Sequence, residues 1–315
     1  MSLRRLKYFV KIVDVGSVTL ASDVLHVAQP ALSQHIATLE AEFNQQLLVR
    51  TSKGVKPTEA GKTLYRHAQS ILKQMEQARV EVSSASASLK GKVSVGLAPG
   101  TAASRLALPL LRAVRSRHPE VVLHLNENFG TTLNEQISDG RMDMAVLYAN
   151  KSVPGLSLLP LLHEELVLVT PQHQPFPGTQ AALFEVAKLG LLMLRPSNVI
   201  RRLVDDAFLR AQLRPRVVAE IESIPTLVNA VTSGIGATIL PLSAARLVSQ
   251  ACGASLTRIS DPMKRVPLAL CTSDSLAPSS AAVAVKSILT DLAEDLAPTI
   301  GAQQSIETSE LFSDT

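Results

Sequence analysis

Apolar positions recur every three or four residues through the first 45 residues and stop at turn-forming residues between the runs. The first run predicts a helix that ends at Gly16. Ser17 is a suitable N-cap for a second helix, and a third helix is expected from about Gln29 to Phe43. In the second helix the pattern predicts burial of Leu20, Ala21, Val24 and Leu25. This segment is therefore predicted to form three short amphipathic helices.

A tight turn is expected between the second and third helices, and the third begins on a polar, uncharged face. Gln29, Ser33 and Gln34 are side chains that can hydrogen-bond to base edges. Pro30 lies in the first helical turn, where its missing N–H has no intrahelical partner to lose. The arrangement is typical of a helix-turn-helix with a recognition helix, so DNA binding is the first functional hypothesis.

A small β wing and a long helix are predicted next. Two short apolar segments, near Leu48 and Val55, flank a turn at residues 51–54, which is the pattern of a hairpin. Thr58 is then placed to cap a helix, with Glu59 at the positive end of the helix dipole.

Nine apolar or small residues follow an alternating spacing of three and four through this long helix, and none of them is charged. Such a seam is typical of a coiled coil, so we expect the helix to pair with a second copy of the chain. The alternative is packing on its own domain, but the winged module is too small to cover a helix roughly 40 Å long. The predicted dimerisation residues are Leu64, Ala68, Ile71, Met75, Ala78 and Val82.

From residue 91 onward, short apolar strands alternate with helices. A β-α-β-α-β order over residues 93–147 predicts a largely parallel, doubly wound sheet, and a second set of the same kind follows over residues 166–240. A strand at 267–270 and a helix at 281–296 are expected to return to the first set. Two α/β subdomains are therefore predicted.

These patterns predict four parts of the chain. They are a winged helix-turn-helix domain (residues 1–58), a linker or dimerisation helix (59–90), a regulatory domain (91–300) and a tail (301–315). Within the regulatory domain, subdomain I is expected at about 91–162 and 266–300, and subdomain II at about 163–265. The tail is rich in Ser, Thr, Gln and Glu, and it is expected to be disordered.

Net charge supports a DNA-binding role for the first part only. The chain carries a formal charge of +4. Residues 1–90 contain 12 Lys and Arg against 7 Asp and Glu, whereas the remaining 225 residues contain 19 against 20. The basic excess therefore lies in the part that would meet phosphate.

Cysteine usage and hydropathy indicate the compartment. Cys252 and Cys271 lie 19 residues apart in apolar surroundings, so buried structural thiols are expected rather than a disulfide. Lys11 and Asp14 interrupt the N-terminal apolar run, which argues against a signal peptide, and no window is long enough to span a membrane. A soluble cytoplasmic protein with no membrane partner is expected.

Several ordered motifs over residues 1–300 resemble those of LysR-type transcriptional regulators. They are Leu6-Lys7-Tyr8-Phe9, Gly16-Ser17, Ala28–Gln34, Leu39-Glu40, Leu48–Arg50, Pro57–Gly61 and Gly234–Pro241. The resemblance implies a winged helix-turn-helix with a long linker helix, followed by two Rossmann-like α/β subdomains as in type 2 periplasmic binding proteins. One departure is Ala28, where the family usually has Ser or Thr, so a cap hydroxyl is missing at the start of the recognition helix.

The resemblance also implies a function. It predicts a sequence-specific regulator that activates some operons and represses others, and it points to operons of nitrogen assimilation. The expected partners are double-stranded DNA at promoter operators, a second copy of the chain (as a homodimer or a dimer of dimers) and RNA polymerase.

The predicted DNA-binding residues are Gln29, Pro30, Ser33, Gln34, His35, Arg4, Arg50 and Lys53. Gln29 or Gln34 is expected to read A·T pairs through adenine N6 and N7. Arg4 sits at the positive end of a helix dipole, which is unfavourable unless a phosphate lies nearby. Arg50 and Lys53 flank the wing turn and are expected to contact phosphate or the minor groove. For Gln34, His35 and Arg4 the alternative is an ordinary solvated position.

The resemblance places an effector cleft between the two subdomains. Its predicted residues are Gly100, Thr101, Ser104, Arg201 and Thr226. The resemblance further implies that operator binding needs no added effector. The local chemistry allows this, because Pro99 removes one N–H donor and Ala102-Ala103 supply no polar side chain at the helix start. The alternative is a regulator of another metabolic pathway that is controlled by a small-molecule coinducer.

Enzymatic functions find little support. His118, His124, His163 and His173 show no metal-ligand spacing, and no P-loop or G-x-S-x-G motif occurs. We therefore expect no catalytic residues, no metal and no cofactor. The alternative from another class is a cytoplasmic solute-binding protein, since the second half alone could be one, but the basic N-terminal module argues against it.

Overall fold

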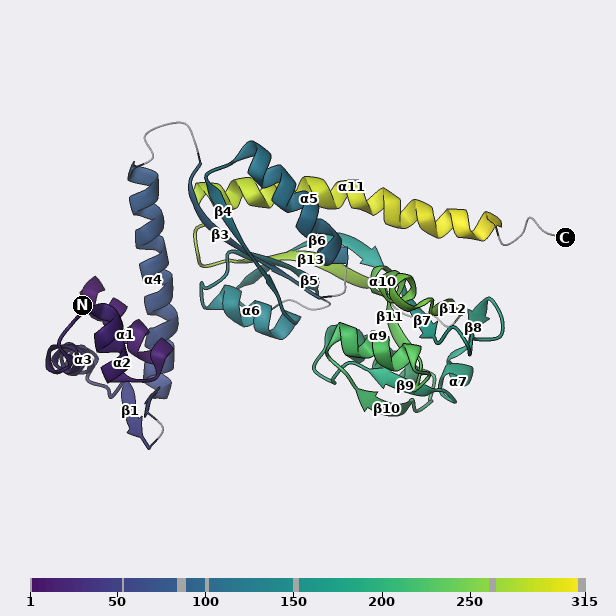
Figure 1. Ribbon diagram of the computed structural model, residues 1–315, viewed down its shortest axis with the longest axis horizontal. Helices are drawn as coiled ribbons and strands as arrows, with labels where there is room; N and C mark the ends of the chain where they lie inside the picture. The colour runs from purple at the N-terminus through teal and green to yellow at the C-terminus, as the bar shows by residue number, and fades with distance from the viewer. Residues whose placement is uncertain are drawn as a thin grey trace. The chain divides into compact units, whose positions relative to one another are not determined.

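The computed structural model describes residues 2–52, 54–83, 89–99, 102–149, 153–260 and 265–310 (Figure 1). The chain divides into two compact units. Unit 1 comprises residues 1–91 with 138–141, and unit 2 comprises residues 92–137 and 142–315. No helix among the described residues is long and apolar enough to cross a membrane.

Unit 1 is three helices, a two-stranded wing and a long helix. Its elements are α1 (Leu3–Val15), α2 (Val18–Leu25), α3 (Gln29–Phe43), β1 (Leu48–Thr51), β2 (Gly54–Pro57) and α4 (Glu59–Ser83). α1 ends at Gly16, whose φ of 70° is left-handed and whose N–H bonds to Ile12 O. The Ser17 hydroxyl accepts from Leu20 N at 3.3 Å, and the Thr58 hydroxyl accepts from Gly61 N at 3.0 Å. Capping therefore sets these helix boundaries as the sequence predicts.

The core of unit 1 lies where α1, α3 and α4 meet. Its fully buried side chains include Leu6, Phe9, Ile12, Leu32, Leu39 and Ala68. In α2 the prediction was wrong for two residues, because Leu20 is 56% exposed and Val24 is 54% exposed. Ala21 is buried as predicted, and Ser22, which was not predicted, is buried as well. A helix of only two turns presents a narrow face to the core, and here small residues occupy that face.

Unit 2 contains two subdomains, each built on its own sheet. Subdomain I has a five-stranded sheet in the order β4-β3-β5-β13-β6. Its elements are β3 (Gly91–Leu97), α5 (Ala102–Arg117), β4 (Val121–Glu127), α6 (Gly130–Ser138), β5 (Met144–Tyr148), β6 (Leu156–Glu164), β13 (Val266–Ser273) and α11 (Ser280–Glu310). Helices α5 and α11 lie side by side along one face of this sheet, and α6 lies on the other (Figure 1).

The sheet of subdomain I is mixed rather than largely parallel. β3 pairs with β5 in parallel, but β13 runs antiparallel to both β5 and β6. The pattern had not predicted β6, because Pro160 interrupts its apolar run. The proline is tolerated on this edge strand, where the register with β13 shifts between Leu268 and Ala269.

Subdomain II has a four-stranded sheet in the order β11-β7-β12-β8, and a separate parallel pair β10-β9. Its elements are β7 (Leu166–Thr170), β8 (Gln180–Ala181), α7 (Leu183–Val186), β9 (Gly190–Met193), α8 (Val199–Arg210), β10 (Arg216–Glu220), α9 (Ile224–Thr232), β11 (Thr238–Pro241), α10 (Leu242–Cys252) and β12 (Ser255–Ile259). Leu192 N donates to Ala237 O at 2.7 Å, which joins the pair to the larger sheet. α10 and β12 were not predicted.

The C-terminal segment differs from the prediction of a disordered tail over residues 301–315. Residues 301–310 continue α11 as helix, and residues 311–315 lie outside the described part of the chain. The sequence prediction rested on polar composition, yet Ala, Gln and Glu in this stretch are good helix formers that can extend an existing helix.

Candidate nucleic-acid interface and effector cavity

The N-terminal end of α3 presents polar side chains to solvent. Gln29, Pro30 and Gln34 are exposed, and Ser33 is half-buried. The Gln29 Nε2 donates to Ser33 Oγ at 3.1 Å, so these two side chains share one face of the helix. All three predicted base-reading groups therefore lie on the first two turns of a helix with an accessible start.

No side chain caps the N-terminus of α3. Ala28 occupies the N-cap position and makes no side-chain hydrogen bond, and Pro30 follows in the first turn. The first backbone N–H groups of α3 therefore receive no hydrogen bond from an N-cap side chain, as the sequence predicts. Such an end attracts phosphate oxygens.

His35 contacts α1 rather than facing solvent fully. Its ring lies 5.2 Å from that of Tyr8, measured between centroids, with an interplanar angle of 50°. The histidine is half-buried. This contact favours a packing role for His35 over the base or phosphate contact that the sequence suggests.

The basic residues around the recognition helix differ in their surroundings. Arg4 is exposed, whereas the neighbouring Arg5 forms an ion pair with Glu42 that ties α1 to the end of α3. Arg50 is exposed on β1 of the wing. Lys53, also predicted to bind DNA, lies outside the described residues.

The wing is held against the first interhelical turn. β1 and β2 pair antiparallel, with Thr51 opposite Gly54, and Val55 N donates to Gly16 O at 2.8 Å. Gly54 has a φ of 118°, and a Cβ at this position would lie 2.4 Å from Gly16 O. Only glycine fits here without moving the wing.

The predicted dimerisation seam divides into two parts along α4. Leu64 and Ala68 are buried in the core of unit 1, and Ile71 packs partly against it, so these residues already have partners within the chain. These three residues therefore pack within their own domain, which is the alternative to dimerisation that the sequence left open. Further along, Met75 is half-buried, Ala78 is exposed, and Val82 is 83% exposed. The last two turns of the seam therefore carry the remaining accessible apolar surface.

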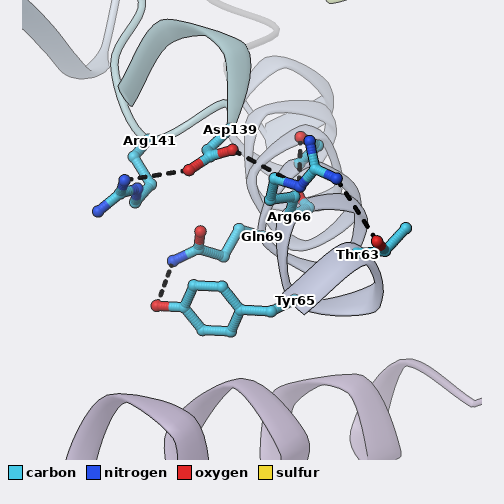
Figure 2. Close-up of polar contacts among 7 residues, drawn as sticks. Thr63, Tyr65, Arg66, Gln69, Asp139 and Arg141 are labelled. Carbon is cyan, nitrogen blue, oxygen red and sulfur yellow. Dashed lines mark hydrogen bonds and ion pairs between the residues drawn. The ribbon is translucent and has the colours of Figure 1, made fainter. Parts of the chain in front are cut away.

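Polar side chains fix α4 to α1 on the side next to the seam. Tyr65 donates to Asp14 of α1, and Gln69 Nε2 donates to the Tyr65 hydroxyl at 2.8 Å (Figure 2). Burial, together with the hydrogen bond to Asp14, raises the pKa of Tyr65 above its ordinary value. The first half of α4 is thus an integral part of the winged domain.

A cavity of about 110 Å³ lies in unit 2 between the two subdomains. Subdomain I contributes the ends of β3 and β5 and the start of α6, and subdomain II contributes the starts of α8, α9 and α10. The lining includes Ala98, Pro99, Phe129, Thr131, Asn134, Tyr148, Ser197, Asn198, Arg202, Ile224 and Pro241. The N-termini of α6, α8 and α9 border this space, and helix N-termini attract small anions.

The structure corrects part of the predicted effector cleft. Arg201 was placed in it, but its guanidinium donates to Asp205, to Glu220 at 3.1 Å and to Leu194 O at 2.8 Å. The next residue, Arg202, lines the cavity instead. Consecutive residues of a helix point about 100° apart, and here Arg201 is turned toward Asp205 and Glu220 while Arg202 lies on the cavity side. The sequence contained both arginines but no signal for which one is buried.

The other predicted cleft residues are placed as follows. Gly100 and Thr101 lie outside the described residues, and Ser104 lies in α5. Thr226 is exposed in α9 and is not part of the lining, whereas Ile224 of the same helix is. Phe129, Thr131, Asn134 and Tyr148 were not predicted, because only the fold brings these segments to the same space.

We expect a clear difference between the two arginines. Burial opposes the charge of Arg201, but hydrogen bonds to Asp205 and Glu220 outweigh it and raise the pKa. Arg201→Leu should lower the unfolding free energy by about 1–3 kcal/mol, less than for a fully buried pair, because the two carboxylate side chains are 40% and 46% exposed. Arg202→Leu should change it little. Thermal unfolding of both variants checks this, and equal losses would contradict the assignment.

Clusters of metal-ligating residues and cysteine thiols are two kinds of group that could support chemistry in the described part of the chain. No group of three His, Cys, Asp or Glu residues there could hold a metal ion. Cys271 is buried, and this burial together with Asp274 raises the pKa of its thiol to about 11. Cys252 is half-buried, and its Sγ donates to Val248 O at 3.1 Å. The raised pKa of the Cys271 thiol disfavours thiolate chemistry at that residue.

Two family models match the chain. The model described as bacterial regulatory helix-turn-helix protein, lysR family, matches residues 3–62. The model described as LysR substrate binding domain matches residues 86–294.

Individual proteins are also similar. The chain is 50% identical over 292 residues to the nitrogen assimilation regulatory protein nac of Klebsiella aerogenes, covering 93% of this chain and 95% of that protein. It is 50% identical over 270 residues to the protein of the same name from Escherichia coli (strain K12), covering 86% and 88%. Full-length CbnR, solved in complex with its target DNA, resembles it with a TM-score of 0.66 at 22% identity, covering 92% and 99%.

Proposed function

Because the chain belongs to the LysR family and is a DNA-binding transcriptional regulator, we propose that it controls promoters of nitrogen assimilation. The observation that carries the proposal is 50% identity to a nitrogen assimilation regulatory protein over 93% of the chain. The exposed polar start of α3 and its uncapped N-terminus support operator binding through this helix.

The proposed roles at the operator follow from side-chain chemistry. Gln29 and Gln34 would read base edges in the major groove, with Ser33 supporting Gln29 through its hydrogen bond. Arg4, Arg50 and Lys53 would contact phosphate or the minor groove, which positions the domain without specifying sequence. Two copies, paired through the end of α4, would read two half-sites. The bound dimer or pair of dimers would then activate some promoters through RNA polymerase and repress others.

We further propose that operator binding needs no added effector. Pro99 in the cavity wall supports this, because a proline has no backbone N–H to donate to a ligand. The cavity is also small, at about 110 Å³, compared with the several hundred Å³ of typical ligand sites.

A coinducer-controlled regulator is the second candidate. The converging helix N-termini and Arg202 favour it, because together they would suit a small anion. Arg202 is therefore the residue that separates the two candidates.

A footprint tests this choice. Purified protein should protect its operator in a promoter fragment of a nitrogen assimilation operon, and dialysed protein plus a cell metabolite extract should give the same protected length. If the extract shortens the protected region and Arg202→Leu or Thr101→Val abolishes that change, the coinducer model is correct. Protein that protects no such promoter under either condition would refute the nitrogen assignment itself.

A further inference from the structure

The hinge between the two subdomains contains a fully buried carboxylate. Glu164 is the last residue of β6, immediately before the chain crosses into subdomain II, and it is 0% exposed. In the register of the second crossing strand it lies opposite Val266. A carboxylate removed from water is unfavourable unless it is well hydrogen-bonded, so its partners indicate its role.

Glu164 has one partner in each subdomain. The Tyr148 hydroxyl, at the end of β5 in subdomain I, donates to Oε1 at 2.5 Å. Ser243 N, in the first turn of α10 in subdomain II, donates to Oε2 at 2.9 Å. α10 has no side-chain cap of its own, so the carboxylate of Glu164 acts as the negative group at its positive end.

Both ends of this connection touch the cavity. Tyr148 forms part of its wall, and so do Pro241 and Ala244, which flank Ser243 at the start of α10. In addition, Ser243 Oγ is buried without a hydrogen-bond partner among the described residues. Buried hydroxyls are normally hydrogen-bonded, so the Ser243 hydroxyl has an unused hydrogen bond in this arrangement of the two subdomains.

We propose that Glu164 is a positioning residue that couples the cavity wall at Tyr148 to α10 and so fixes the relative setting of the two subdomains. Displacement of the Tyr148 hydroxyl would release one oxygen of Glu164. That oxygen could then accept from Ser243 Oγ, which gives the hinge a second hydrogen-bonded setting. The regulatory consequence rests on the proposed DNA-binding function, whereas the coupling itself does not.

Amide hydrogen exchange of Ser243 in the full-length protein tests the coupling. Tyr148→Phe keeps the aromatic wall and removes only the hydroxyl, and it should raise the exchange rate at Ser243 about tenfold, because the freed carboxylate no longer holds this N–H in one geometry. Glu164→Gln should keep most of the protection, since its amide can accept from Ser243 N and donate to the Tyr148 oxygen. Glu164→Leu should lose more than either.

The matched control is the neighbouring hinge ion pair. Arg265 donates to Glu165 at 2.8 Å, but the arginine side chain is 58% exposed. Arg265→Gln should leave exchange at Ser243 unchanged, because exposed pairs contribute little. If Tyr148→Phe also leaves it unchanged, Glu164 is only a local cap of α10 and the proposal is wrong. Should Glu164→Leu fail to fold, Tyr148→Phe and Glu164→Gln still decide the question.

A second readout concerns DNA. Tyr148→Phe should change the protected length or the bend of a bound operator while operator affinity stays within about twofold. A changed exchange rate with an unchanged footprint would support the coupling and refute its regulatory consequence. Loss of operator binding by the unsubstituted protein would instead refute the proposed function, so the two failures can be told apart.

Discussion

Ala78→Glu is expected to convert the protein to monomers and to lower its affinity for a two-half-site operator by about 100-fold or more. Ala78 is exposed within the chain and lies between Met75 and Val82 on the accessible part of the α4 seam. Glutamate is a good helix former, so the isolated helix should tolerate it. In a paired seam, however, it would bury two like charges against each other. Loss of the second half-site then removes the avidity of linked binding.

The structure dictates this choice of residue. Ile71 also lies on the predicted seam, but it packs partly against the core of unit 1, so a charge there would disturb the winged domain as well as the dimer. Gln77→Glu is the matched control, because it adds the same charge one residue away and off the seam. Sedimentation equilibrium measures the outcome. An intact dimer in Ala78→Glu, with operator affinity unchanged, would contradict the assignment.

Local signals in the sequence were sufficient to place most of unit 1. Gly16, Ser17 and Thr58 mark helix ends through backbone conformation and capping, and each of them does so in the structure. These effects act over three or four residues and can therefore be read from the sequence. The exposed start of α3 follows in the same way from Pro30 and the missing hydroxyl at Ala28.

Long-range effects account for what the sequence did not reveal. Pro160 made β6 resemble a loop, and only its position at the sheet edge explains how a strand tolerates it. Leu64 and Ala68 could pack equally well against a second chain or against α1. Both kinds of contact require small or apolar residues at the same spacing. The three-dimensional structure decides between such alternatives, and the periodicity does not.

The cavity shows the same limit at a functional site. Its lining comes from segments as far apart as Ala98 and Ala244. Arg201 and Arg202 are adjacent and chemically alike, and only the positions of Asp205 and Glu220 determine which one is buried. The role of Glu164 was equally hidden, because its partners lie 16 and 79 residues away in the chain.

Gln34→Ala is expected to lower the affinity for the specific operator by about 1–3 kcal/mol, roughly 5- to 150-fold, with a much smaller loss for random DNA. Gln34 is exposed on the second turn of α3, where its amide can form a bidentate contact to adenine. Lys53→Ala is the informative comparison, since a phosphate contact should weaken binding to both DNAs and reduce the salt slope by about one unit. Titration of each variant with operator and random duplexes at several salt concentrations separates the two effects. If Gln34→Ala weakens both duplexes equally, Gln34 contacts the DNA backbone, and base reading must rest on Gln29 and Ser33.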